Sequence, residues 1–307
     1  MIDGCASRSR ACGERPLGSA SRARRWILLE QPGPWGADAL TSSDLPGPVA
    51  ARLRRLSRDL PARVLLLRRP GGAVTGTTRR SLFVGRSHAG GGWLEHLELE
   101  SVHDLLDLDL SPLVADRSVG GQRVTEPRYL VCTNGKHDAC CASFGLPVAA
   151  ALADLLGDRV WECSHVGGDR FAGNLVCLPD GSFYGHLDPE SARRAVAAHE
   201  GGRILLDHWR GRSALPFAAQ AAEALVRREL ALERLSSLRV LRVERLDGSG
   251  ALHRVELGTA DDATVIATVR TGSRPEARAL TCNGVPGHAP TFELVSLERE
   301  AEPSRSG

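Results

Sequence analysis

The stretch that decides the fold is residues 129–168, YLVCTNGKHDACCASFGLPVAAALADLLGDRVWECSHVGG. It contains an apolar run, a polar loop, an apolar segment that opens with Leu146-Pro147, and a second apolar run. The pattern predicts a strand, a helix over residues 145–157 and a second strand. Pro147 is expected in the first turn of that helix, where a missing N–H group costs nothing. Strands that alternate with helices favour an α/β protein with a partly parallel sheet.

The same order of segments occurs earlier in the chain, in residues 26–72. Such an internal repeat predicts a unit that is used twice. Each copy continues into a hairpin-like stretch, at residues 81–99 in the first copy and 174–187 in the second. A strand–helix–strand opening, a β-hairpin and a further helix follow the order of a thioredoxin-like fold. We therefore expect two tandem thioredoxin-like units, of which the first is degenerate.

The expected organisation places a small β-rich appendage after the two units. From Leu238 onward, short stretches of strand-forming residues are separated by Gly, Asp and Ser turns. The predicted boundaries are a mobile arm at 1–19, the first unit at 20–125, the second unit at 126–236, the appendage at 237–300 and a disordered tail at 301–307.

Composition argues against several classes of protein. The chain has 307 residues, of which 42% are hydrophobic and 25% charged, as in an ordinary soluble protein with a core. The formal charge of +2 and the aromatic content of 4% disfavour a nucleic-acid-binding protein. The longest apolar runs are far shorter than the roughly 20 residues that span a bilayer. We expect a cytoplasmic protein, in which cysteines stay reduced.

Five of the eight cysteines lie in the second copy, and four of them are close to the two strand ends. Loops at the carboxyl ends of adjacent parallel strands lie side by side, so Cys132 and Cys141 are expected to converge with Cys163 and His165. Thiolates together with imidazole suit zinc or an iron–sulfur cluster. The spacing alone leaves redox thiols open as an alternative, with Cys140-Cys141 as an adjacent pair.

At these residues the sequence resembles the sucrase/ferredoxin-like family. Cys132 and Cys141, with His137-Asp138 between them, are similar to its first ligand segment. The string SHVGGDRFAGN at 164–174 is similar to its most distinctive motif, and the segments LEQPGPWG and WRGRS also resemble bacterial members. The resemblance implies that the second unit is a thioredoxin-like ferredoxin domain with a [2Fe–2S] cluster, and that the chain is an electron-transfer protein.

The resemblance also implies a ligand set of two cysteines and two histidines. Cys132 and Cys141 match the cysteine positions and His165 matches the first histidine, whereas Asp169 stands at the second histidine position. We expect Asp169 as the fourth ligand, with Cys163 and Cys140 as the other candidates.

Four further residues of the motif are expected to contact the cluster or its loop: Gly167, Gly168, Arg170 and Asn174. Glycines allow close approach of the backbone, so that amide N–H groups can reach the cluster sulfurs. The redox partner protein is not identified by the sequence. A paired-carboxylate setting for glycoside hydrolysis is not recognisable in the motif regions, so we do not expect a glycosidase. A thiol-based redox protein and a structural zinc protein remain alternatives.

Overall fold

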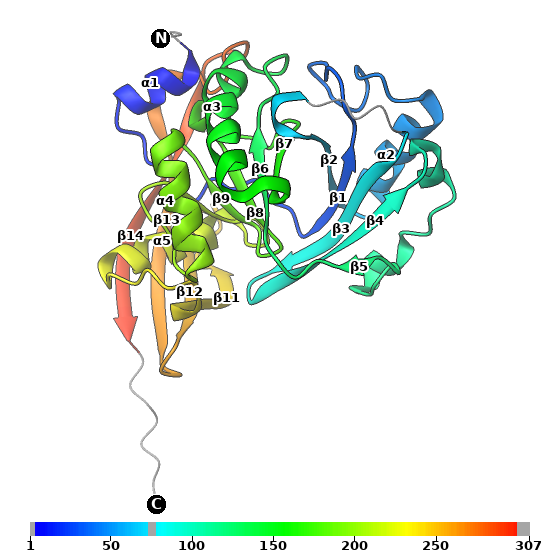
Figure 1. Ribbon diagram of the computed structural model, residues 1–307. Coiled ribbons are helices and arrows are strands. Elements are labelled where there is room, and N and C mark those ends of the chain that lie inside the picture. Colours follow the sequence, from blue (N-terminus) through cyan, green and yellow to red (C-terminus); the bar gives the residue numbers. More distant parts are fainter. Residues whose placement is uncertain (1–3, 73–77, 300–307) are drawn as a thin grey trace, which may run out of the picture.

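Two β-sheets organise the chain in the computed structural model, which describes residues 4–72 and 78–299 (Figure 1). The α-helices of the described residues are α1 (Cys5–Ala11), α2 (Gly47–Asp59), α3 (Ala139–Leu156), α4 (Pro189–Glu200) and α5 (Phe217–Glu229). The strands of the large sheet are β1 (Arg25–Glu30), β2 (Ala62–Arg68), β3 (Arg80–His88), β4 (Gly91–Leu99), β5 (Gln122–Arg123), β6 (Arg128–Cys132), β7 (Val160–Cys163), β8 (Leu175–Leu178), β9 (Ser182–Tyr184) and β10 (Trp209–Arg212). The second sheet contains β11 (Leu238–Arg245), β12 (Leu252–Thr259), β13 (Thr264–Arg278) and β14 (Gly287–Arg299).

The large sheet consists of two halves with the same internal order. Its strand order is β10-β9-β8-β6-β7-β2-β1-β3-β4-β5. In the first half, β1 and β2 are parallel, α2 connects them, and the antiparallel strands β3 and β4 follow. In the second half, β6 and β7 are parallel, α3 connects them, and β8 and β9 follow. The mixed α/β class and the repeated strand–helix–strand–hairpin order are therefore confirmed.

The alternation of side chains along the strands creates a core on each face of the sheet. On β1, Trp26 and Leu28 face a core shared by both halves, whereas Ile27 faces the core beneath α2. On β6, Leu130 and Cys132 face the shared core, and the intervening residues face α3 and α4. Cys132 is thus held in the shared core by the same alternation that buries Leu130.

Helix α3 begins earlier than the sequence pattern predicts. It starts at Ala139, because the side chain of Asp138 caps it by accepting a hydrogen bond from the Cys140 N–H. The prediction that Pro147 lies in the first turn was wrong: Pro147 lies inside the helix. In α2, by contrast, Pro48 does lie in the first turn. The earlier start places both adjacent cysteines in the first turn of α3.

Within the part of the chain that the structure describes, one helical stretch, Ala139–Arg159, is long and apolar enough to cross a membrane by length and composition. In the structure it packs on the sheet, with Val148 and Leu152 buried in the core of the second half. That packing is typical of a core helix in a soluble domain.

Part of the stretch expected as a mobile arm forms helix α1. One face of this short helix is buried, with Cys5, Ala6 and Ser9 against the second half. The segment just after α1 is also held in place, because Glu14 forms an ion pair with Arg170. The small residues on one face of α1 allow this close packing. The tail expected at 301–307 lies outside the described residues.

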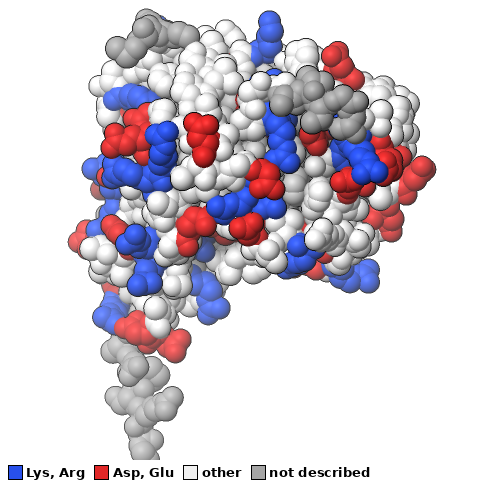
Figure 2. All heavy atoms as spheres, viewed as in Figure 1, with Lys and Arg blue, Asp and Glu red and all other residues white. Residues whose placement is uncertain are grey.

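The small C-terminal β appendage that the sequence predicts is present as the second sheet, which is antiparallel in the order β11-β12-β13-β14. Helix α5 packs against β10 of the large sheet and against the second sheet. Basic and acidic side chains alternate over the face of the molecule seen in Figure 2, without a region of one sign on that face.

Candidate metal centre

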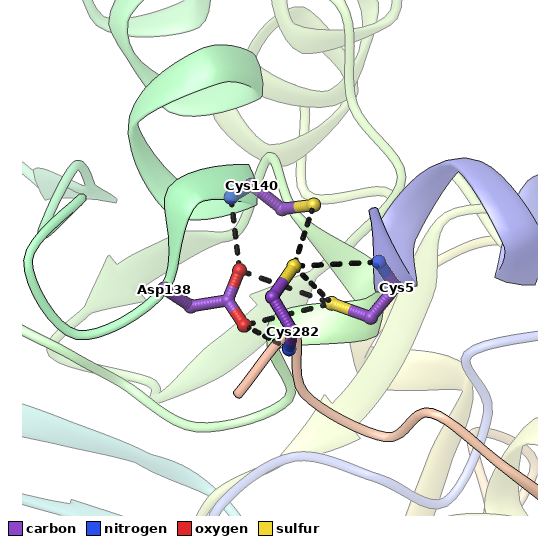
Figure 3. Close-up of side chains that lie close together, drawn as sticks. All are labelled: Cys5, Asp138, Cys140 and Cys282. Carbon is purple, nitrogen blue, oxygen red and sulfur yellow. Dashed lines mark hydrogen bonds between the residues drawn. The ribbon is translucent and has the colours of Figure 1, made fainter. Parts of the chain in front are cut away.

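The adjacent cysteines at the start of α3 point into two different groups of side chains. Successive residues of a helix are rotated by about 100° relative to each other. Cys140 lies with Cys5, Asp138 and Cys282 (Figure 3), whereas Cys141 lies with Cys132 and His165. The first turn of α3 therefore contributes one cysteine to each of two groups.

The group of Cys132, Cys141 and His165 lies at the ends of the parallel strands β6 and β7. Cys132 is the last residue of β6, and its register partner Cys163 is the last residue of β7. His165 follows two residues later, in the loop after β7. The sulfur atoms of Cys132 and Cys141 and a ring nitrogen of His165 lie within 4.8 Å of one another. The predicted convergence of these three side chains is present in the structure.

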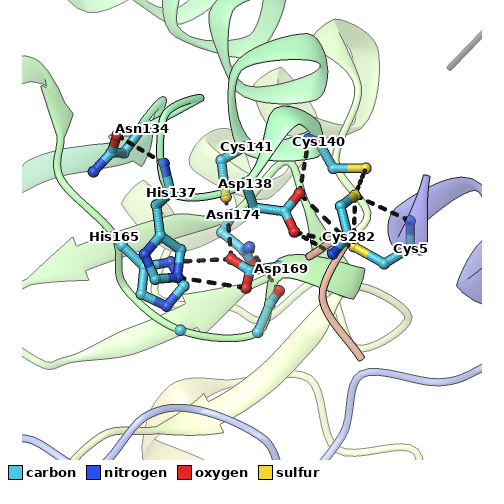
Figure 4. Close-up of polar contacts among 12 residues, drawn as sticks. Cys5, Asn134, His137, Asp138, Cys140, Cys141, His165, Asp169, Asn174 and Cys282 are labelled. Atoms are coloured by element: carbon cyan, nitrogen blue, oxygen red, sulfur yellow. Dashed lines mark hydrogen bonds and ion pairs between the residues drawn. The ribbon is translucent and has the colours of Figure 1, made fainter. Parts of the chain in front are cut away.

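A second histidine, His137, joins the site from the loop between β6 and α3. Its ring stacks on His165 with 3.6 Å between the ring centroids. Both histidines face Asp169: His165 Nδ1 lies 3.0 Å from Oδ1, and His137 Nε2 lies 3.7 Å from Oδ2 (Figure 4). The two histidines and Asp169 offer ligand atoms within 4.8 Å of one another.

The first half of the chain orients His137. Nδ1 of His137 lies 3.0 Å from the carbonyl oxygen of Ala37, which can only accept a hydrogen bond, so Nδ1 carries the proton. Nε2 is then the basic nitrogen, and it is the one that faces Asp169. The neighbouring Asn134 donates a hydrogen bond to the Gly36 carbonyl at 3.2 Å. A histidine that donates its second ring N–H to a carbonyl is typical of metal ligands.

His137 was not among the site residues predicted from the sequence. The signal that could have identified it is its spacing, because His137 stands five residues after Cys132 and four residues before Cys141, in a C-x4-H-x3-C pattern. Its fixed orientation depends on Ala37, about 100 residues away in the sequence, and a local pattern does not contain that contact.

The thiols of Cys132 and Cys141 differ in pKa. A hydrogen bond from the Cys141 thiol, supported by His165, lowers the pKa of Cys132 well below its usual value despite complete burial. The same bond to Cys132, together with burial, raises the pKa of Cys141. Cys141 Sγ also lies 3.3 Å from Asp169 Oδ1. Cys132 is therefore the thiolate of the pair.

The histidine and carboxylate beside them form a charged pair. Burial alone would lower the pKa of His165, but hydrogen bonding and charge from Asp169 and Cys132 outweigh it and raise the pKa to about 9. Burial would likewise raise the pKa of Asp169, and its interactions with His165 instead lower it. Positive charge on His165 thus offsets part of the negative charge of Asp169 and Cys132.

The donor atoms of this site fit a soft metal or an iron–sulfur cluster. His165 Nδ1 is buried and lies 3.0 Å from Asp169 Oδ1. Two sulfurs and two ring nitrogens match the ligand types of zinc and of histidine-ligated clusters.

The four further residues expected to contact the cluster hold the loop after β7. Gly167 and Gly168 both have positive φ, and a Cβ at Gly168 would collide with the Arg210 guanidinium. Asn174 donates a hydrogen bond to the Gly168 carbonyl at 3.0 Å. Arg170 turns away from the metal centre towards Glu14. The N–H group that reaches the Cys132 sulfur is that of Val166.

Arg210 on β10 supports the same loop from inside the protein. Its side chain is buried and donates hydrogen bonds to the Gly167 carbonyl at 2.9 Å, to Asn174 Oδ1 at 2.8 Å and to both oxygen atoms of Ser19. Burial lowers the pKa of Arg210 to about 9. The loop carrying His165 is therefore fixed by one buried guanidinium.

Two other candidates for the fourth ligand lie apart from the site. Among the described residues, Cys163 belongs to neither group of ligand atoms, although it is a register partner of Cys132. Cys140 belongs to the group formed with Cys5 and Cys282. Asp169 and His137 remain beside the site.

A family model described as sucrase/ferredoxin-like matches residues 16–211. The matched stretch includes both strand–helix–strand units and all the side chains of the site formed by Cys132, Cys141, His137, His165 and Asp169. No curated protein matches the chain, and no solved structure matches it.

Proposed function

The chain belongs to the sucrase/ferredoxin-like family, and from that premise we propose that it is an electron-transfer protein with one [2Fe–2S] cluster. The observation that carries the proposal is the convergence of Cys132, Cys141 and His165 at the ends of two parallel strands. Bound there, such a cluster would supply one-electron redox chemistry at a potential set by its ligands and surroundings.

The residues of the chain have separate roles in this proposal. Cys132 and Cys141 provide two thiolate ligands from the shared core, where water is excluded. His165 provides a neutral nitrogen ligand, which raises the reduction potential relative to a thiolate. Arg210 contributes a buried positive charge behind the loop, which favours the more negative, reduced state.

For the fourth ligand we propose His137 in place of Asp169. The Ala37 carbonyl fixes the His137 ring with Nε2 directed at the site, as an orienting partner does for a ligand. Two histidines would complete the Cys2His2 set that the family resemblance implies. Asp169 would then be a charged neighbour of the ligands, with its Oδ1 3.0 Å from His165 Nδ1.

The electron would leave the cluster through His137 and His165. The side chains of His137 and His165 are 33% and 23% exposed, whereas Cys132 and Cys141 are buried. A redox partner protein therefore meets the site at the histidines, and its identity is open. We propose neither nucleic acid nor membrane as a partner.

We also propose that the two halves are tandem thioredoxin-like units, the first without ligands and the second ferredoxin-like. The matching strand orders of the two halves support this assignment. The free cysteines are consistent with a cytoplasmic location, where thiols stay reduced.

Low-temperature electron paramagnetic resonance on dithionite-reduced protein tests the cluster. We expect a brown protein with iron and sulfide in equal amounts and a signal that appears only on reduction. The same sample distinguishes the alternatives. A colourless protein whose zinc disappears in the Cys132→Ser variant would instead establish a zinc protein, and a disulfide between Cys132 and Cys141 without iron would establish a thiol redox protein.

His137→Cys tests the fourth ligand. An anionic thiolate in place of a neutral imidazole stabilises the oxidised cluster, so we expect a reduction potential lower by on the order of 100 mV, with iron retained. Asp169→Asn should keep the iron and the visible spectrum. His88→Cys, at an exposed position, is the control for an added thiol. An unchanged potential in His137→Cys combined with loss of iron in Asp169→Asn would assign Asp169 as the ligand.

A further inference from the structure

Three cysteines from distant parts of the chain meet at a second place in the molecule. Cys5 opens helix α1, Cys140 lies in the first turn of α3, and Cys282 lies in the loop between β13 and β14 (Figure 3). They surround the carboxylate of Asp138, the capping residue of α3. Cys5 and Cys282 lie outside the residues that match the family model.

The distances within this group are those of a tetrahedral metal site. Cys282 Sγ lies 3.5 Å from Cys140 Sγ and 3.6 Å from Cys5 Sγ. With zinc–sulfur bonds of about 2.3 Å, two sulfurs of a tetrahedron are about 3.8 Å apart. Cys5 Sγ also lies 3.7 Å from Asp138 Oδ2, close to the roughly 3.5 Å that a sulfur and an oxygen span around zinc. All four ligand atoms lie within 4.8 Å of one another.

Backbone N–H groups hold the ligand atoms in place. The Cys140 N–H donates to Asp138 Oδ1 at 2.9 Å, and the Cys282 N–H donates to Oδ2 at 2.6 Å. The Cys5 N–H points to the Cys282 sulfur at 3.4 Å. Hydrogen bonds that orient ligands in this way accompany metal sites and fix the direction of their lone pairs.

Burial and charge also favour a bound cation. Asp138 is completely buried, and so are Cys5 and Cys140 at 2% and 0% exposure. The side chains that lie with this carboxylate are three thiols, which carry no positive charge. A buried carboxylate is costly without compensating charge, and a divalent ion would supply such charge.

We propose that Cys5, Asp138, Cys140 and Cys282 bind one structural zinc ion. Three sulfurs and one carboxylate oxygen complete a tetrahedron, so the ion has no open position for a substrate. Three thiolates with one carboxylate carry the same charge as the four thiolates of a common structural zinc site. The ion would tie helix α1 and the hairpin of the second sheet to α3, the helix that carries Cys141.

A disulfide explains the group less well. Two sulfurs can pair, but the third cysteine would be left over, and all three converge on the same carboxylate. The proposed zinc site does not depend on the cluster site, because its ligands include neither Cys132 nor Cys141.

Metal analysis of the purified, dialysed protein tests the site. We expect one zinc per chain in the wild-type protein, and loss of that zinc in Cys5→Ser, Cys140→Ala and Cys282→Ser. Cys12→Ser is the matched control, since Cys12 is exposed and lies just beyond the end of α1. It should keep the zinc. Iron should be retained in Cys140→Ala. The zinc content therefore tests the zinc site, and the iron content independently tests the cluster.

Cobalt(II) provides a second measurement if a single variant does not fold. Added to a Cys132→Ser/Cys141→Ser double variant, cobalt is expected to give the absorption of a tetrahedral thiolate complex, and a further Cys282→Ser change should abolish it. Zinc-free wild-type protein that takes up no added zinc would overturn the proposal. So would zinc retained in all three single variants, or a disulfide among these cysteines in the protein as purified.

Discussion

The Cys132→Ser and Cys141→Ser proteins are expected to purify without iron and without visible absorption. Both sulfurs lie in the core shared by the two halves, and each is next to the other and to His165. A serine hydroxyl at either position is a hard and much less acidic donor, which holds a cluster poorly. Loss of either thiolate therefore removes the bound iron and not merely a fraction of it.

Cys177→Ala is the control for this experiment. Cys177 is also completely buried in the second half, but among the described residues it belongs to neither group of ligand atoms. It should keep iron and the spectrum. Far-ultraviolet circular dichroism should show native secondary structure in all three proteins. Visible bands that persist in Cys132→Ser or Cys141→Ser would refute the ligand assignment.

Arg210→Met is expected to destabilise the protein by about 3 kcal/mol, because it leaves buried hydrogen-bond acceptors without a donor. These acceptors are the Gly167 carbonyl, Asn174 Oδ1 and the Ser19 carbonyl. The free energy of unfolding, measured by urea titration, should fall accordingly, and the loop with His165 should hold iron less tightly.

Arg117→Met provides the comparison, since the Arg117 side chain is exposed. Its free energy of unfolding should stay within about 0.5 kcal/mol of the wild-type value. An equally small change for Arg210→Met would show that the guanidinium does not support the loop. Arg210→Lys should restore only part of the stability, because an ammonium does not reproduce the fork of a guanidinium.

The repeated unit could be predicted from the sequence because it depends on local periodicity. Short apolar runs, helical spacing and Gly/Pro punctuation follow one another in the same order twice, and the sheet has that order in both halves. The convergence of Cys132 and Cys141 with His165 follows from the same pattern, since adjacent parallel strands end side by side.

Other features depend on contacts between distant segments, which a local pattern does not encode. The start of α3 depends on Asp138, whose cap overrides the expectation based on Pro147. The orientation of His137 depends on Ala37 in the first half. Helix α1 could not be foreseen as a packed element, because the partners of Cys5 lie 133 residues or more further along the chain.

The junction between the two halves covers what would otherwise be an open edge of the sheet. Strand β7 pairs with β2 through Leu67 opposite Cys163 and Arg68 opposite Glu162, and the Ser164 N–H donates to the Leu66 carbonyl at 2.9 Å. Without the first half, β7 would present unpaired backbone groups at an open sheet edge beside the apolar Trp161. Such edges recruit strands from other molecules. Because β2 of the first half pairs with β7, both edges of β7 are covered within the chain, by β6 on one side and β2 on the other.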